Sequence, residues 1–116
     1  MRKLILALGA AALLTAPAAL AKERNLSLIV PTSSKAGKAV MATIAVKMDG
    51  RYTPGKTPVV RIINAAGKAV TIRSLPTSKA GIYRARLLFP TAGVWRVLVV
   101  DRETGRSYEF HKVRAT

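Results

Sequence analysis

One segment of the chain alternates apolar side chains so regularly that it restricts the fold of the whole protein. Apolar residues occupy every second position of this segment: Val40, Ala42, Ile44, Val46 and Met48. Successive side chains of a β-strand point to opposite faces, so a period of two predicts a strand over residues 38–48 with one face in a core. No stretch of useful length after residue 21 has the three-to-four-residue period of a helix.

Six further strands are predicted between the Gly and Pro residues of the chain. Their ranges are 25–30, 58–64, 68–73, 81–89, 94–100 and 106–114. The sequence predicts loops between them, including those at 32–37, 49–55 and 75–80. Seven short strands with turns about every 8–12 residues are typical of an antiparallel sandwich of immunoglobulin type. We therefore expect an all-β fold, a seven-stranded antiparallel immunoglobulin-like sandwich, with an open barrel as the alternative.

Residues 1–21 have the layout of a secretory signal peptide. A positive start, Met1-Arg2-Lys3, precedes an uncharged apolar run over residues 4–14, and an A-x-A cleavage site follows at residues 19–21. We predict a signal-peptide helix that is cleaved, and an exported protein that works in the periplasm or outside the cell. Retention as an anchor stays open, because residues 4–21 provide 18 residues where a membrane span needs roughly 20.

Residues 22–116 then form a single mature domain with a strong positive charge, after a flexible lead-in at residues 22–24. Removal of Arg2 and Lys3 from the 20 Lys and Arg leaves 18 against five acids, hence a net charge of +13. This charge favours an anionic envelope polymer or lipid surface as the partner. The cations are scattered rather than clustered in a dense run, which makes nucleic acid a poor candidate. Scattered cations are also typical of a solvated surface, and a protein partner stays open.

The residue inventory argues against catalysis. The chain has no cysteine, which excludes disulfides, thiol redox chemistry and thiolate metal sites. Ser107 and the single histidine, His111, lie four positions apart on a predicted strand, about 13 Å by strand rise, too far for a nucleophile and its base. The five acids show no glycosidase-like pairing. We expect a protein that is not an enzyme and has no cofactor.

The most distinctive pattern is Gly81-x-Tyr83-x-Ala85-x-x-x-Phe89-Pro90-x-x-Gly93-x-Trp95. Alternation places Tyr83 and Phe89 on one face of their strand and Trp95 on the facing strand, which predicts core aromatics. The stretch over about residues 40–100 resembles the YtkA-like and copper-resistance CopC-like domains, which are exported immunoglobulin-like sandwiches with G-x-Y and G-x-W strands. The resemblance implies that fold, and it gives an alternative function as an accessory factor for copper handling or respiratory-complex assembly.

The soft metal ligands of the mature chain are Met41, Met48 and His111. Met41 and Met48 lie an odd number of positions apart, so they point to opposite faces of one strand. Residues 68–80, where YtkA-like domains are Met-rich, contain neither Met nor His. We therefore predict no metal site, and these three residues are the ligand set of the copper alternative.

The candidate polyanion-binding residues are five outward cations: Lys47, Arg61, Arg84, Arg86 and Arg96. In an immunoglobulin-like order one outer face carries Lys47, Arg84 and Arg86. The other outer face carries Arg61 and Arg96. Guanidinium groups suit bidentate contact with phosphate or carboxylate. The sequence thus predicts a binding or accessory module of the bacterial envelope. A protein partner could also be reached through an open strand edge, at 25–30 or 106–114.

Overall fold

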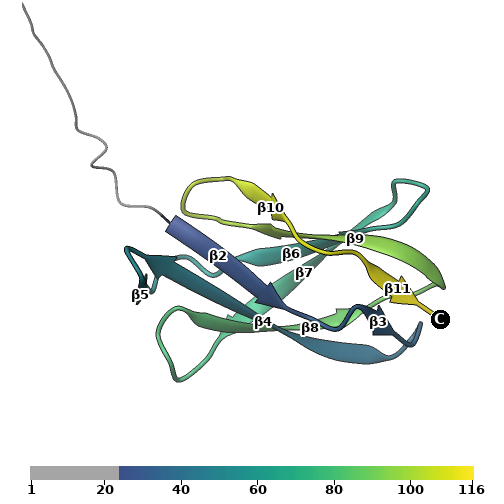
Figure 1. The fold of residues 1–116 in the computed structure, drawn as a ribbon, viewed down its shortest axis with the longest axis horizontal. Coiled ribbons are helices and arrows are strands. Elements are labelled where there is room, and N and C mark those ends of the chain that lie inside the picture. The colour runs from purple at the N-terminus through teal and green to yellow at the C-terminus, as the bar shows by residue number, and fades with distance from the viewer. Residues whose placement is uncertain (1–23) are drawn as a thin grey trace, which may run out of the picture.

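The computed structural model describes residues 24–116, and every regular element in this range is a strand (Figure 1). The strands are β2 (Arg24–Ile29), β3 (Ser33–Ser34), β4 (Ala39–Met48), β5 (Arg51–Tyr52), β6 (Val59–Ile63), β7 (Ala69–Pro76), β8 (Ile82–Leu88), β9 (Gly93–Val100), β10 (Ser107–Glu109) and β11 (Val113–Ala115). The all-β prediction is confirmed. The predicted signal peptide, 1–21, lies outside the described residues, and within those residues no helix is long and apolar enough to cross a membrane.

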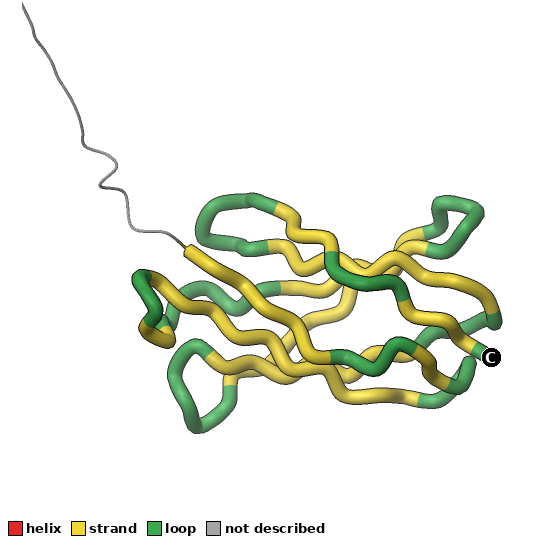
Figure 2. Tube along the Cα trace, viewed as in Figure 1, coloured by secondary structure: helices red, strands yellow, loops and turns green. Residues whose placement is uncertain are grey.

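The strands form one mixed sheet that curls into a half-barrel (Figure 2). Its order is β2-β4-β8-β7-β6-β9-β11-β3, with β5 paired to β4 and β10 paired to β9. All pairs are antiparallel except β11 and β3, where Arg114 lies beside Ser33 in a parallel pair. The prediction of seven strands, all antiparallel, is therefore wrong in strand number and in this one pairing, and the structure shows one curled sheet where a sandwich of two sheets was expected.

β7 explains why the hydrogen bonding is continuous rather than divided between two sheets. Residues 69–73 of this strand pair with β6, and residues 74–76 pair with β8. The strand therefore extends to Pro76, into a segment that the sequence predicted as a loop. Because one strand pairs with both halves, it forms the corner around which the sheet curls.

The predicted strand at 106–114 is divided in two. β10 pairs with one end of β9, where Ser107 lies opposite Val100, and β11 pairs with the other end, where Val113 lies opposite Trp95. Between these two pairings the last segment has three residues, 110–112, whereas the matching stretch of β9 has only two, 96 and 97. The last segment therefore contains one extra residue. This is the arrangement of a β-bulge, which re-aims the strand.

The core fills the hollow of the curled sheet. The rings of Phe89 and Trp95 lie 5.8 Å apart at a tilt of 58°, and both side chains are buried, as is Tyr83. The prediction of core aromatics is confirmed. The apolar side chains of the inward positions complete the core: Leu28, Val30, Ala42, Ile44, Val46, Val60, Ile62, Ala85, Leu87, Val97, Val99, Val113 and Ala115.

Gly81, the first residue of the G-x-Y pattern, brings two turns into contact. Its φ is +79°, and a Cβ at this position would lie 2.7 Å from the backbone nitrogen of Thr53 and 2.9 Å from the carbonyl oxygen of Val46. The amide of Val46 donates to the carbonyl of Gly81 at 2.8 Å. Only glycine satisfies both the backbone angle and the close approach without strain.

The N-terminal strand is fixed by an ion pair. Arg24 of β2 donates to Asp101, directly after β9, from Nε to Oδ2 at 2.8 Å and from Nη2 to Oδ1 at 2.9 Å. The side chain of Asp101 is only 2% exposed. The predicted flexible lead-in is therefore wrong at Arg24, because this contact ties one end of the sheet to the opposite half of the molecule.

Candidate functional site

Three of the predicted cations lie on one outer surface of the sheet. Thr43 of β4 pairs with Arg84 of β8, and Met41 pairs with Arg86, so these side chains share a face with Lys47. Arg84 and Arg86 are exposed, while Lys47 is half-buried. We call this surface the β4–β8 face and define it by Ile29, Met41, Lys47, Tyr52, Leu75, Arg84, Arg86 and Leu88.

Exposed apolar side chains surround these cations. Ile29 is 72% exposed and Leu75 is 67% exposed, and both lie in one row with Thr43 and Arg84 across four strands. Five of the six large hydrophobic side chains that are exposed in the described range belong to this face, the two already named with Met41, Tyr52 and Leu88. Single exposed apolar residues are ordinary, whereas a group on one face marks an interaction surface.

Tyr52 gathers two ammonium groups at one end of the face. The Nζ atom of Lys47 lies 4.7 Å from the centroid of the Tyr52 ring, and that of Lys79 lies 4.6 Å from it. Ammonium groups within about 6 Å of an aromatic ring are attracted to its negative face. This contact explains why Lys47 is only half-exposed, and it concentrates positive charge beside Tyr52.

The carboxylates of residues 24–116 lie away from the centre of this face. Asp101 and Glu109 are in ion pairs elsewhere, and Glu103 accepts a hydrogen bond from the amide of Lys56. Asp49 lies in the turn between β4 and β5, at the border of the face. Within this range, Arg84 and Arg86 therefore have no carboxylate within ion-pair distance.

The second predicted basic surface is partly neutralised. Arg61 and Arg96 share an outer face, as predicted, because Arg61 pairs with Leu98 and Ile63 pairs with Arg96. However, Arg96 donates to Glu109 of β10, from Nε at 2.9 Å and from Nη2 at 2.8 Å. This contact lowers the pKa of Glu109. Arg61 is only half-exposed, whereas Arg73, which pairs with Val59, is exposed on the same outer face. The β4–β8 face is distinguished from this one by its exposed apolar side chains.

The candidate copper ligands lie apart. Met41 points outward from β4, whereas Met48 pairs with Arg24 at the first position of β2. His111 lies in the bulge, with Nε2 2.9 Å from the carbonyl oxygen of Val30, just past the other end of β2. Arg24 and Val30 are about 20 Å apart by strand rise, so Met48 and His111 do not meet. Residues 24–116 contain no group of three His, Cys, Asp or Glu side chains placed to hold a metal.

Comparison with known proteins gives no family, curated protein or solved structure that matches this chain. The resemblance to YtkA-like and CopC-like domains is therefore unconfirmed. The candidate site rests on the geometry of the β4–β8 face alone. Sequence reasoning identified its cations but missed Ile29, Leu75 and Leu88, although these sit at outward positions of predicted strands or next to them.

Proposed function

We propose that this protein is an exported, non-enzymatic module that binds an anionic lipid surface of the cell envelope through the β4–β8 face. The observation that supports the proposal most strongly is the mixture of Arg84 and Arg86 with exposed apolar side chains on one sheet face. Guanidinium groups bind lipid phosphates, and the apolar side chains enter the boundary between head groups and acyl chains. The export step rests on the signal-peptide pattern of residues 1–21.

The apolar residues are the reason to prefer a lipid surface to a soluble polyanion. A polymer such as teichoic acid offers phosphate groups but no place for Ile29, Leu75 or Met41. A bilayer offers both, and each cation near an anionic leaflet contributes about 1 kcal/mol. Because salt screens only the electrostatic part, part of the binding should persist when the ionic strength is raised.

An immunoglobulin-like relationship of the fold belongs to the same proposal. It is supported by the Gly81–Trp95 pattern and by β7, which pairs with both halves of the curled sheet and places two groups of strands around one core. Exported immunoglobulin-like domains commonly act as binding modules, which agrees with the absence of a catalytic pattern from the sequence.

Vesicle sedimentation with paired variants tests the proposed function. We expect the full protein to bind vesicles that contain phosphatidylglycerol and not vesicles of phosphatidylcholine alone. Loss of two cations in the double variant Arg84→Ala/Arg86→Ala should weaken binding about 30-fold, at about 1 kcal/mol each. The matched control is Arg106→Ala/Arg114→Ala, which removes the same charge from two exposed positions outside the face.

The control variant should retain nearly all of the vesicle affinity. Equal losses in the two double variants would mean that net charge, and not the β4–β8 face, drives the association. A Leu75→Ser variant should lower the binding that remains at high salt, since it removes apolar surface without changing charge.

A further inference from the structure

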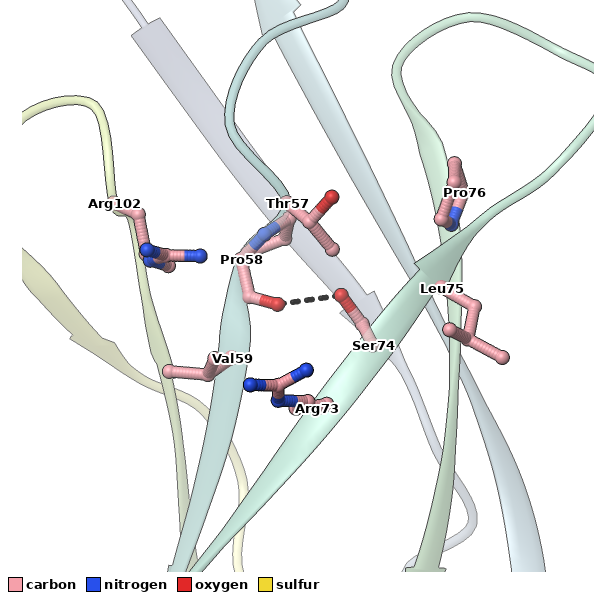
Figure 3. Close-up of a pocket in the computed structure, with 8 residues that line it drawn as sticks. All are labelled: Thr57, Pro58, Val59, Arg73, Ser74, Leu75, Pro76 and Arg102. Atoms are coloured by element: carbon pink, nitrogen blue, oxygen red, sulfur yellow. Dashed lines mark hydrogen bonds between the residues drawn. The ribbon is translucent and has the colours of Figure 1, made fainter.

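A small pocket lies where β6 and β7 diverge, away from the centre of the β4–β8 face. Its volume is about 280 Å³, and its walls are the start of β6 at Pro58 and Val59, residues 73–76 of β7, and Arg102 after β9 (Figure 3). Drug-sized ligands usually occupy pockets of about 300–1,000 Å³. The size therefore suits a head-group-sized molecule.

The fork between the two strands is fixed by a buried hydrogen bond. β7 pairs with β6 as far as Arg73 and turns to β8 from Ser74 onward. The hydroxyl of Ser74 donates to the carbonyl oxygen of Pro58 at 2.5 Å, and both residues are buried (Figure 3). This hydrogen bond joins two residues that line the pocket, and it holds the start of β6 against β7 at the point where the two strands diverge.

Two arginines reach the same wall from strands on either side of β6. Val59 pairs with Arg73 of β7 on one side and with Val100 of β9 on the other, and Arg102 lies two positions beyond Val100. The flanking strands are about 10 Å apart, at about 4.8 Å per strand spacing. Figure 3 shows both guanidinium groups beside the Pro58–Val59 segment.

No carboxylate lines this pocket. The ion pairs among residues 24–116 are Arg24 with Asp101 and Arg96 with Glu109, so they include neither Arg73 nor Arg102. Glu103, the neighbour of Arg102 in sequence, accepts a hydrogen bond from the amide of Lys56 instead. Two cations that face one wall repel each other unless solvent or an anion lies between them.

We propose that this pocket binds the phosphate group of a small organic phosphate. The oxygens of a phosphate are arranged around a tetrahedral centre and can accept from guanidinium groups on two different sides, whereas a carboxylate offers two oxygens in one plane. The apolar walls at Pro58, Val59 and Leu75 would contact the organic substituent. The site is separate from the centre of the β4–β8 face, although Leu75 borders both, and it does not depend on the proposed lipid-surface function.

A titration of the full protein with propyl phosphate, followed by backbone amide chemical shifts at constant ionic strength, tests the proposal. We expect saturable shifts at Val59, Arg73 and Ser74. The double variant Arg73→Ala/Arg102→Ala should bind at least about 100-fold more weakly, since each charged hydrogen-bond donor contributes more than about tenfold. The matched control, Arg106→Ala/Arg114→Ala, removes the same charge from two exposed positions outside the pocket and should bind propyl phosphate as the native protein does.

Three results would overturn the assignment. The first is a linear response without saturation, and the second is unchanged binding in Arg73→Ala/Arg102→Ala. The third is binding of propionate as tightly as propyl phosphate, which would show that the site does not select phosphate. Failure of the vesicle experiment would leave the pocket result intact, because the two experiments depend on different arginines.

The source of the phosphate is distinguished by a second ligand. A water-soluble phosphatidylglycerol with short acyl chains, used below its micelle concentration, presents a lipid head group to the same pocket. Tighter binding of this lipid than of propyl phosphate would assign the pocket to a membrane lipid. The reverse order would assign it to a soluble phosphate ester, and both orders support phosphate recognition.

Discussion

At the scale of single residues, two opposing effects meet at Asp101. Burial by itself raises the pKa of this carboxyl. The hydrogen bonds from Arg24 and from the amide of Glu103 lower the pKa by a larger amount, so it lies below the ordinary value. The same contact raises the pKa of Arg24. Sequence reasoning missed this pair because its members are 77 positions apart, and alternation identifies faces but not partners.

The direction of the Asp101 shift predicts how stability depends on pH. A carboxyl whose pKa is lower in the folded state than in the unfolded chain stabilises the fold above about pH 4. This contribution is lost as the pH falls through the folded-state pKa. We therefore expect Arg24→Ala, which leaves a buried carboxylate without its partner, to lower the free energy of unfolding by about 3 kcal/mol near neutral pH.

Urea unfolding of Arg24→Ala and of the native protein, at neutral pH and at about pH 3, measures this difference. The loss should shrink at the acidic pH, because protonation of Asp101 removes the uncompensated charge. Arg96→Ala is the control, since its ion pair with Glu109 is exposed and should contribute little. A pH-independent loss, or the same loss in both variants, would disprove this account of Arg24.

At the scale of elements, alternation predicted where strands occur but not which strands pair. The predicted strands at 38–48 and 81–89 correspond closely to β4 and β8, because each buries every second side chain. β3 and β5 were not predicted, because each is only two residues long and a segment of that length shows no alternation. The extension of β7 to Pro76 and the division of the last strand depend on partners distant in sequence, which the pattern of one strand does not contain.

The close approach at Gly81 gives a prediction at this scale. Gly81→Ala and Gly105→Ala both place a side chain at a positive φ, +79° and +78°, but a Cβ at Gly105 meets no atom within 4 Å. We expect Gly105→Ala to lower the free energy of unfolding by about 1 kcal/mol. Gly81→Ala should cost at least about 1 kcal/mol more, because backbone atoms must shift. An equal loss of unfolding free energy in the two variants, measured by urea unfolding, would contradict this prediction. It would show that the close approach of Gly81 to Thr53 and Val46 does not exclude a side chain.

At the scale of the whole molecule, the curled sheet has two outer surfaces that differ in their exposed apolar side chains. On one, Arg96 is paired with Glu109 beside Arg61 and the exposed Arg73; on the other, Arg84 and Arg86 stand among exposed apolar side chains. The sequence placed the five cations on their faces correctly, because side-chain direction follows from alternation. It did not distinguish the two faces, since the position of Glu109 and the apolar neighbours depends on register between strands.

The most direct test of the β4–β8 face maps which surface approaches the bilayer. Anionic bicelles that carry a paramagnetic head group broaden the amide signals of residues near the membrane. We predict the strongest broadening at Ile29, Met41 and Arg86, and little at the outward residues of β6 and β9. Equal broadening of both surfaces, or stronger broadening around Arg61 and Arg96, would contradict the account.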